Sequence, residues 1–239
     1  MNLFVSWSGG KDSALAAYRA LQQGHRLACL LNCAAEDGSR VRSHGFPADV
    51  VALQARAMGI PLVQVYTSWE DYEANFKDAL RTLKASGVEG GVFGDMDVEE
   101  HRTWVERVCA EVGMRPLLPL WKADPWALLE EFWRAGFRAL VVATRLDPAL
   151  LGRPLDRELV AEMAARGAHP CGEQGEYHTL VTDGPLFRYP LRVERPPDAP
   201  AVLEHDGVWF LNLNAHNLGD SHLEGDCHLR TMEMENALG

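Results

Sequence analysis

The residues best suited to chemistry lie near the N-terminus, in the stretch Ser8 to Ser13 (SGGKDS), between an apolar run and a helical pattern. Gly9 and Gly10 allow the backbone to turn sharply and to approach a ligand closely. The amides that begin the following helix have no partners within it, and the helix dipole favours an anion there. Lys11 adds a positive charge, and the two flanking serines can donate hydrogen bonds to phosphate oxygens. The stretch therefore predicts a phosphate-binding loop.

Asp12, within the same stretch, points to a metal ion. A carboxylate would repel phosphate directly, so we expect Asp12 to hold Mg²⁺, which bridges carboxylate and phosphate oxygens. The alternative is a turn with an ordinary helix cap, because serine and aspartate are good capping residues. Two glycines, a lysine and two serines after a strand favour the phosphate-binding interpretation.

Alternating elements must position this loop. Strands are expected over 3–7, 27–33, 62–66, 91–93 and 139–143. Helices are expected after the first strand up to Gly24 and over 47–58, 72–85, 99–112, 126–134 and 157–165, while 169–187 is expected to be a loop. The alternation predicts an α/β fold, a parallel sheet with helices on both faces, in which ligands bind at the carboxyl ends of the strands. The phosphate loop and Gly94-Asp95 both follow such ends.

The division of the chain is expected to be a nucleotide-binding domain over 1–122, a smaller α+β lobe over 123–195 that binds substrate, and an acidic tail over 196–239. The stretch after Pro196 begins with prolines and then suggests a hairpin that turns at Asp206-Gly207.

Composition excludes several classes of protein. The chain has 239 residues, 47% hydrophobic and 24% charged, which is not the composition of a disordered protein. Its net charge of -11 argues against a broad nucleic-acid surface. No apolar run approaches the roughly 20 residues that span a bilayer, and the N-terminus has no secretion signal pattern. Five cysteines without a CxxC pair favour a reducing cytoplasm.

The loop SGGKDS resembles the PP-loop of the N-type ATP pyrophosphatases, whose motif is SGGxDS. This resemblance implies a HUP-like nucleotide-binding domain and the use of ATP. It also implies that the loop holds the β,γ-pyrophosphate and leaves the α-phosphate open to attack, so that the products are AMP and pyrophosphate.

Three further segments narrow the resemblance to the diphthine–ammonia ligase family. They are RSHGFPADVVALQARAMGIPL, Gly94-Asp95 with EEHRTWVERVCAEVGMRPLLPLW, and CGEQGEYHTLVTDGPLF (Cys171 to Phe187), together with LDPALLGRPLD. The resemblance covers Met1 to about Leu191, and the Gly-Glu-x-Gly-Glu-aromatic loop is its most specific part. Gln174 stands where the family often has another glycine, which we expect to be tolerated if that position needs no positive φ.

The family's reaction is the ATP-dependent amidation of a carboxylate by ammonia, with an adenylated intermediate. In named members the carboxylate belongs to diphthine, a modified histidine on a translation elongation factor. The resemblance thus implies ATP and Mg²⁺ as cofactors, with ammonia and such a carboxylate as partners. Because two negatively charged reactants must meet, Mg²⁺ and Lys11 are expected to neutralise phosphate charge.

Several carboxylates are candidates for the chemistry. Asp95 is expected to lie near the metal or the nucleotide, with a helix cap as the alternative. Glu173 and Glu176 are expected to bind ammonium, remove its proton, or bind a trimethylammonium group.

The remaining candidates each have a plainer alternative. Tyr177 is expected to form an aromatic wall for a cation, although a core tyrosine is nearly as good an interpretation. His44 and His178 are expected in the site, against surface or capping roles. Cys171 invites thiol chemistry but lacks a second cysteine nearby. The residues expected to bind the nucleotide are Ser8, Gly9, Gly10, Lys11, Asp12, Ser13 and His44. Those expected to bind the acceptor are Cys171, Gly172, Gly175, Tyr177 and His178. The expected catalytic residues are Lys11, Asp95, Glu173 and Glu176, and the expected metal ligands are Asp12 and Asp95.

Two other functions stay open. The chain could be a PP-loop ATPase that acts on another carboxylate or on tRNA, or a nucleotide-binding protein without turnover. A basic surface and redox-active cysteines would favour tRNA, and neither is visible in the sequence. Lys11, Asp12 and Asp95 are all present, which favours an enzyme.

Overall fold

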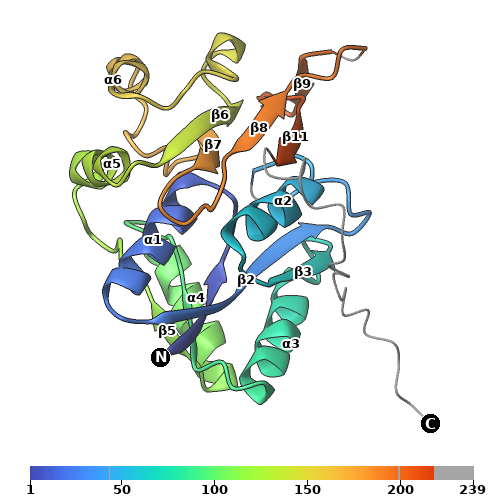
Figure 1. The fold of residues 1–239 in the computed structure, drawn as a ribbon, viewed down its shortest axis with the longest axis vertical. Helices are drawn as coiled ribbons and strands as arrows, with labels where there is room; N and C mark the ends of the chain where they lie inside the picture. The colour runs from blue at the N-terminus through green and yellow to red at the C-terminus, as the bar shows by residue number, and fades with distance from the viewer. Residues whose placement is uncertain (43, 199, 218–239) are drawn as a thin grey trace.

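The computed structural model describes residues 1–42, 44–198 and 200–217, and its first part alternates strands and helices (Figure 1). These elements are β1 (Asn2–Ser6), α1 (Lys11–Gln22), β2 (Arg26–Ala35), α2 (Asp49–Met58), β3 (Leu62–Thr67), α3 (Tyr72–Ala85), β4 (Gly90–Val92), α4 (Glu99–Val112) and β5 (Arg115–Leu117). The strands form one parallel sheet in the order β3-β2-β1-β4-β5. The α/β fold predicted from the sequence is confirmed.

Helices cover both faces of this sheet because successive strand residues point to opposite sides. Leu3 and Val5 of β1 pack in one core with residues of α1 and α2. Phe4 points the other way, into a second core with α3 and α4, and its ring centroid lies 6.4 Å from that of Phe76. Glycines end two of these helices: Gly59 ends α2 and Gly113 ends α4, each in the left-handed conformation with a φ of 66°. Within the described residues, no helix is long and apolar enough to cross a membrane.

The second lobe is built on antiparallel strands. Its elements are α5 (Pro125–Arg134), β6 (Arg138–Thr144), the 3₁₀ turn η1 (Pro148–Leu150), α6 (Arg157–Ala165), β7 (Tyr177–Asp183), β8 (Leu191–Glu194), β9 (Val202–His205), β10 (Val208–Leu211) and β11 (Asn214–Asn217). One sheet has the order β7-β6-β10-β9, and β11 pairs with β8. The hairpin predicted at Asp206-Gly207 is confirmed, with φ of 51° and 74° at its turn.

Four strands differ from the sequence predictions, and two of them, β8 and β11, lie where no strand was expected. The segment 169–187 was expected to be a loop, which is wrong for Tyr177–Asp183, because these residues form β7 against β6. Tyr177, Thr179, Leu180 and Val181 are all buried, so the strand lacks the alternation that marks a half-exposed strand. The edge strand β5 was not predicted, since Pro116 interrupts a very short apolar stretch and proline is confined to sheet edges and bulges.

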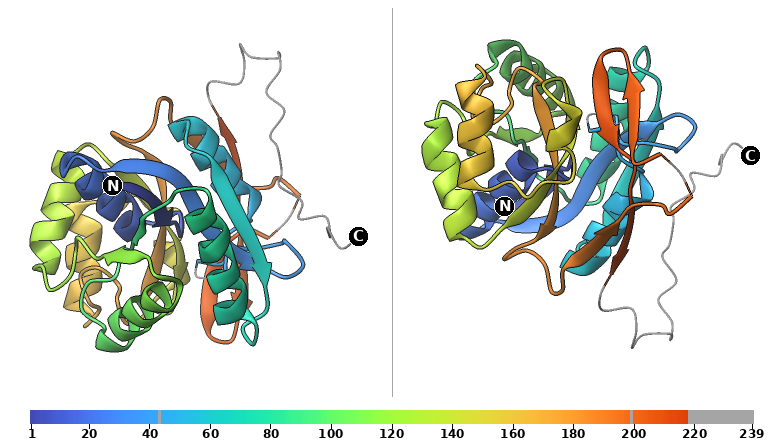
Figure 2. Two further views of the ribbon diagram at one scale, coloured as in Figure 1. Left: turned by 90° about the horizontal axis from the view of Figure 1, so that it is seen from below. Right: turned by 90° about the horizontal axis from the view of Figure 1, so that it is seen from above.

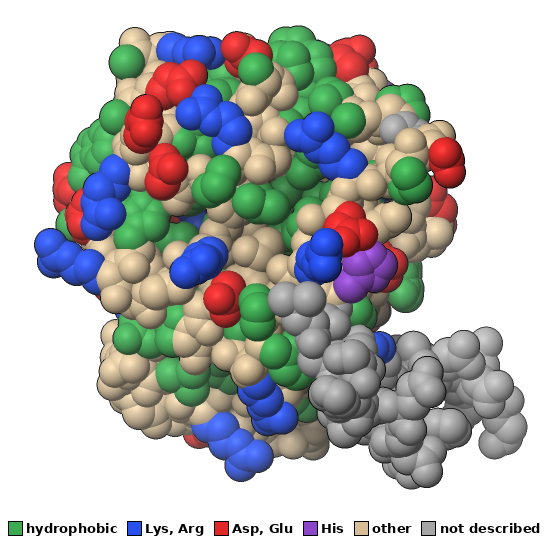
Figure 3. Space-filling view, turned by 45° about the horizontal axis from the view of Figure 1, so that its top comes forward, with side chains coloured by type: hydrophobic (Ala, Val, Ile, Leu, Met, Phe, Trp, Pro, Cys, Tyr) green, Lys and Arg blue, Asp and Glu red, His purple; other side chains and the backbone are tan. Residues whose placement is uncertain are grey.

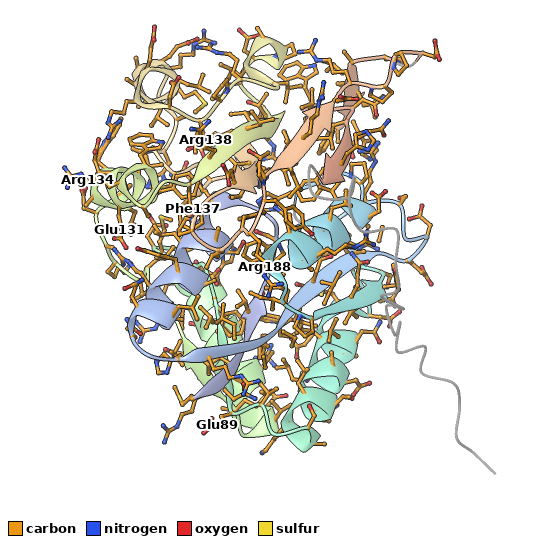
Figure 4. The ribbon with its side chains drawn as sticks, viewed as in Figure 1. Glu89, Glu131, Arg134, Phe137, Arg138 and Arg188 are labelled. Atoms are coloured by element: carbon orange, nitrogen blue, oxygen red, sulfur yellow. The ribbon has the colours of Figure 1, made fainter. Side chains whose placement is uncertain are left out.

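The two lobes share one hydrophobic core, which contains residues of β1, α1 and α2 together with residues of α5, β6, α6 and β7. In both views of Figure 2, α5 and α6 lie on the same side of the molecule as α1. Arg19 of α1 donates to Glu131 of α5, with Nε 2.9 Å from Oε1. Figure 4 labels Glu131 on α5. Arg188 reaches the end of α2, where its amide donates to Ala57 O at 2.8 Å.

The predicted division at 122 and 195 remains a proposal. β10 pairs with β6, so the hairpin after Pro196 belongs to the same sheet as the second lobe. The rest of the proposed tail, 218–239, lies outside the described residues.

Candidate functional site

The carboxyl ends of β1 and β4 meet at the start of α1. Gly94 follows β4 and packs directly on the first turn of α1, where a Cβ on Gly94 would lie 2.8 Å from Asp12 C and 2.9 Å from Ser13 N. Only glycine allows this approach without moving backbone. The contact brings the segment with Asp95 to the phosphate loop, as the strand order predicts.

The phosphate loop is held by its own serines. The Gly10 amide donates to Ser8 Oγ at 3.3 Å, Ser13 Oγ donates to Gly10 O at 3.0 Å, and the two hydroxyl oxygens are 3.2 Å apart. The N-cap of α1 is Gly10, which has no side chain that could cap the helix, although Thr179 of the second lobe accepts from the first helix amide, that of Lys11. The remaining amides of the first turn stay suited to an anion.

Lys11 points into the second lobe. Its side chain is buried, Nζ donates to Asp12 Oδ2 at 2.8 Å and to the Cys171 carbonyl oxygen, and it lies 5.3 Å from the centre of the Tyr177 ring. Burial opposes a charge on Lys11, but the adjacent Asp12 carboxylate raises the pKa of Lys11 above its ordinary value. The lysine therefore stays charged and joins the phosphate loop to the loop before β7.

β7 binds the phosphate loop along its backbone. The Lys11 amide donates to Thr179 Oγ1 at 3.1 Å, and the Val181 amide donates to Gly9 O at 2.9 Å. A Cβ on Gly10 would lie 3.1 Å from Thr179 O. The second lobe is thus part of the framework of the loop.

His44 and His178 lie together beside Gly10. Their ring centroids are 4.8 Å apart, and a Cβ on Gly10 would lie 2.5 Å from His44 Nε2. Burial, the neighbouring His178 and the charge of Lys11 hold the pKa of His44 well below its usual range. Burial also lowers the pKa of His178, to about 4, with Lys11 and Arg145 acting in the same direction. Both rings are therefore neutral at pH 7 in the absence of an anion.

Asp95 and Asp97 lie before α4 but do not cap it, since the N-cap is Val98 and no side chain caps this helix. Asp95 Oδ1 lies 3.3 Å from His101 Nδ1, and Asp97 Oδ2 lies 3.5 Å from His169 Nε2. The hydrogen bond to Asp95 raises the pKa of His101. Asp95 also lies close enough to Asp12 and Glu173 for its charge to help raise the pKa of both, so it belongs to the same acidic cluster.

Glu173 lies among negative charges. Burial raises the pKa of Glu173 to about 8, and the nearby Asp12, Asp97 and Asp95 act in the same direction against the charge of Lys11. The group is thus mostly protonated at pH 7. A cation bound beside it would favour the ionised form, so this part of the site is suited to a positively charged reactant.

Glu176 has different surroundings. Its Oε1 accepts from the His169 amide at 2.6 Å and its Oε2 accepts from the Gln174 amide at 3.0 Å. Both oxygens support the loop backbone. This arrangement differs from the catalytic role predicted from the sequence and makes Glu176 a structural support of the loop.

Tyr177 and Cys171 also serve the loop rather than a bound cation. Tyr177 is buried, Lys11 lies over its ring, and its hydroxyl donates to the Pro170 carbonyl oxygen. The face expected to receive a substrate cation is therefore occupied by Lys11. Cys171 contributes its carbonyl, and burial raises the pKa of its thiol to about 12, which disfavours thiolate chemistry.

Two glycines of this loop have a positive φ, 71° at Gly172 and 81° at Gly175. Gln174 does not have a positive φ, so its replacement of a common glycine is tolerated, as expected. A Cβ on Gly172 would lie 2.7 Å from Tyr177 O, which makes glycine necessary there.

Sequence reasoning missed Thr179 and Gln54, two buried polar residues in contact with the phosphate loop. Thr179 carried no signal, because its segment was expected to be a loop. The sequence did contain a signal for Gln54, because this polar residue lies on the apolar helical stripe of Val50, Val51, Ala55 and Met58.

Comparison with protein families gives two matches. Residues 1–116 match the diphthamide synthase N-terminal domain, and residues 124–217 match the diphthamide synthase C-terminal domain. The second match continues past Leu191, where the resemblance was expected to end, and includes the β9–β10 hairpin.

Curated relatives agree with these matches. The chain is 29% identical to the diphthine–ammonia ligase of Bos taurus, over 91% of this chain and 90% of that protein. It is 29% identical to the diphthine–ammonia ligase of Danio rerio, over 94% of this chain and 97% of that protein. The diphthine–ammonia ligase of Schizosaccharomyces pombe is 30% identical over 76% of this chain but only 34% of its own length.

Among solved structures, a predicted subunit of tRNA methyltransferase from Methanocaldococcus jannaschii DSM covers 75% of this chain and 95% of its own, with a TM-score of 0.42 and 15% identity.

Proposed function

Since this chain belongs to the diphthamide synthase family, we propose that it is an ATP-dependent ligase that converts a carboxylate to an amide with ammonia and forms AMP and pyrophosphate. One observation carries the proposal. Lys11 lies in the SGGKDS loop and its ammonium group bonds to the carbonyl of Cys171, at the head of the glutamate-containing loop. A loop suited to pyrophosphate and a loop suited to a second reactant are therefore adjacent.

The proposed reaction has two steps. An acceptor carboxylate oxygen attacks the α-phosphorus of ATP, and the bond to the β-phosphate oxygen breaks to release pyrophosphate. Ammonia then attacks the carbonyl carbon of the acyl adenylate, AMP leaves with the bridging oxygen, and the nitrogen loses a proton. The first step makes the second possible, because AMP is a far better leaving group than the oxygen of a free carboxylate.

The phosphate loop is proposed to hold the β- and γ-phosphates. The amides of the first turn of α1 other than that of Lys11 supply hydrogen-bond donors, Ser8 and Ser13 line the loop, and the neutral His44 and His178 lie beside Gly10. An anion there would raise the pKa of both imidazoles and allow them to donate to it.

The donor set also fits Mg²⁺. Asp12 lies in the first turn of α1, and Asp95 follows Gly94, which packs on that turn. Mg²⁺ in such sites commonly takes one or two carboxylates together with phosphate and water oxygens. Among the described residues, no group of three or more His, Cys, Asp or Glu is arranged to hold a metal alone. A magnesium ion here would therefore rely on the nucleotide, and it would neutralise phosphate charge.

Glu173 is proposed to take the proton from ammonium or from the attacking nitrogen. Its raised pKa of about 8 makes its carboxylate a stronger base than an ordinary glutamate, and a bound ammonium would favour the ionised form that accepts the proton. The excess of carboxylates around it attracts a cation, which is how ammonia occurs at neutral pH.

The acceptor we propose is the carboxylate of diphthine on a translation elongation factor, because relatives across nearly the full length of this chain are named diphthine–ammonia ligases. The test is incubation of the purified chain with ATP, ¹⁵N-ammonium and elongation factor carrying diphthine, followed by peptide mass spectrometry. We expect ¹⁵N in the modified histidine only when ATP is present. Absence of ¹⁵N under conditions in which a relative amidates the same preparation would contradict the proposed acceptor.

A further inference from the structure

Gln54 is a fully buried amide in an otherwise apolar stripe of α2. Its Oε1 accepts from the Trp7 indole at 2.9 Å, and its Nε2 donates to Gly9 O at 3.0 Å and to Val181 O at 2.8 Å. Both donors of the amide and its acceptor are therefore used. Because a buried amide is costly unless bonded, this side chain is fixed to Trp7 just after β1, to the phosphate loop and to β7.

The hydrogen bond from Gln54 to Gly9 O helps to orient the peptide between Gly9 and Gly10. Gly9 has a φ of 82°, and its carbonyl accepts from both Gln54 Nε2 and the Val181 amide. In a trans peptide the carbonyl and the following N–H point in opposite directions. Holding the Gly9 carbonyl toward α2 and β7 therefore turns the Gly10 amide into the loop, where it meets Ser8 Oγ.

Gln54 also limits the space behind the loop. A Cβ on Gly9 would lie 2.9 Å from Gln54 Oε1 and 2.6 Å from the tip of the Phe46 ring. The loop backbone thus lies directly on a buried amide and an aromatic ring, and loss of the amide would leave the Gly9 carbonyl held by the Val181 amide alone.

We propose that Gln54 is the positioning residue of the phosphate loop, which holds the Gly9 carbonyl so that the loop amides face the pyrophosphate part of ATP before the nucleotide binds. This inference rests on the proposed use of ATP. Gln54 acts through Gly9 and touches no reactant. Its loss should therefore weaken the binding of ligands that carry β- and γ-phosphates and leave the binding of AMP almost unchanged.

The test compares ATP and AMP binding to the full chain by isothermal titration calorimetry. Gln54→Met keeps the length of the side chain and removes both donors, so we expect ATP affinity to fall about tenfold, the size of one buried hydrogen bond, and AMP affinity to change less than about twofold.

Asn32→Leu is the matched control. Asn32 is another buried amide that bonds to the carbonyl of Trp7 and to Gln64. It should lower the melting temperature and leave the ratio of ATP to AMP affinity unchanged. If Gln54→Met does not fold, Gln54→Asn, which is too short to hold both carbonyls, is judged by the same ratio.

The outcomes separate the two proposals. A fall in the ATP-to-AMP affinity ratio in the Gln54 variant alone supports the inference. An unchanged ratio in a folded Gln54 variant, or an equal fall in Asn32→Leu, overturns it. If the unsubstituted protein binds ATP no more tightly than AMP, the proposed use of ATP is wrong, and so is the proposed role of Gln54.

Discussion

Two glutamates of one short loop illustrate how surroundings decide the role of a residue. Glu176 gives both carboxylate oxygens to backbone amides of its own loop. Glu173 lies partly buried among acidic neighbours that raise its pKa. The same type of side chain thus supports the loop backbone at one position, and at the other it lies where the surrounding negative charge favours a bound cation.

We expect Glu173→Gln to reduce the rate of amide formation by about a hundredfold or more, the usual effect of losing a general base, with little change in ATP binding. Amide formation at saturating ATP and ATP affinity by calorimetry measure the two quantities.

Glu176→Gln is the matched comparison. It replaces one accepting oxygen by a donor that would face a backbone N–H, so we expect a lower melting temperature and a smaller loss of rate. A larger loss of rate in Glu176→Gln than in Glu173→Gln would reverse our assignment of the two residues.

His178 should make the fold sensitive to acid. Its folded-state pKa of about 4 lies below the ordinary value of 6.5, so the unfolded state binds more protons between these values. Stability is therefore present above pH 6.5 and falls as the pH drops toward 4. We expect the melting temperature to fall between pH 7 and pH 5, and to fall less in His178→Gln. Equal falls in both proteins would show that His178 does not contribute.

At the scale of elements, sequence patterns located the helices closely because apolar periodicity and glycine stops act locally. α3, α4 and α6 have the expected bounds, and α2 ends at the expected Gly59. β5, β7, β8 and β11 were not predicted because each becomes a strand only beside a partner strand elsewhere in the chain. β7 is buried by α1 and β6, and β5 becomes a strand only beside β4.

The candidate site divides in the same way. The SGGKDS loop and Asp95 could be predicted because a strand end and a helix start are local features. The direction of Lys11 could not, since the acceptor of its bond is the Cys171 carbonyl in the other lobe. Nor could the meeting of His44 with His178, which requires β7 to lie on the phosphate loop.

The close approach of β4 to α1 provides a test at this scale. Gly94→Ala places a Cβ within 3 Å of the α1 backbone, so the start of α1 must shift. We expect lower stability and roughly tenfold weaker ATP binding. Gly136→Ala is the control, because it adds strain at a φ of 91° but meets nothing within 4 Å. It should lower stability and retain ATP affinity, and a similar loss of affinity in both variants would contradict the assigned role of Gly94.

For the whole molecule, surface charge bears on the choice of partner. On the face in Figure 3, Lys and Arg side chains are interspersed with Asp and Glu rather than gathered in one region. The net charge of -11 adds repulsion toward a polyanion. These features disfavour tRNA as the acceptor.

We therefore expect no saturable binding of tRNA at physiological salt below about 100 µM, near the weak end of non-specific binding. Filter binding or fluorescence anisotropy with total tRNA measures this. Tight binding that persists as salt is raised would instead support the tRNA-modifying alternative.

We propose that the two lobes together form a site that splits ATP between its α- and β-phosphates to drive amide formation. Chromatographic identification of the nucleotide products, with ammonium and elongation factor carrying diphthine present, tests this. We expect AMP and pyrophosphate in equal amounts, with AMP equal to the amide formed. ADP and phosphate as the products, with no pyrophosphate, would contradict it.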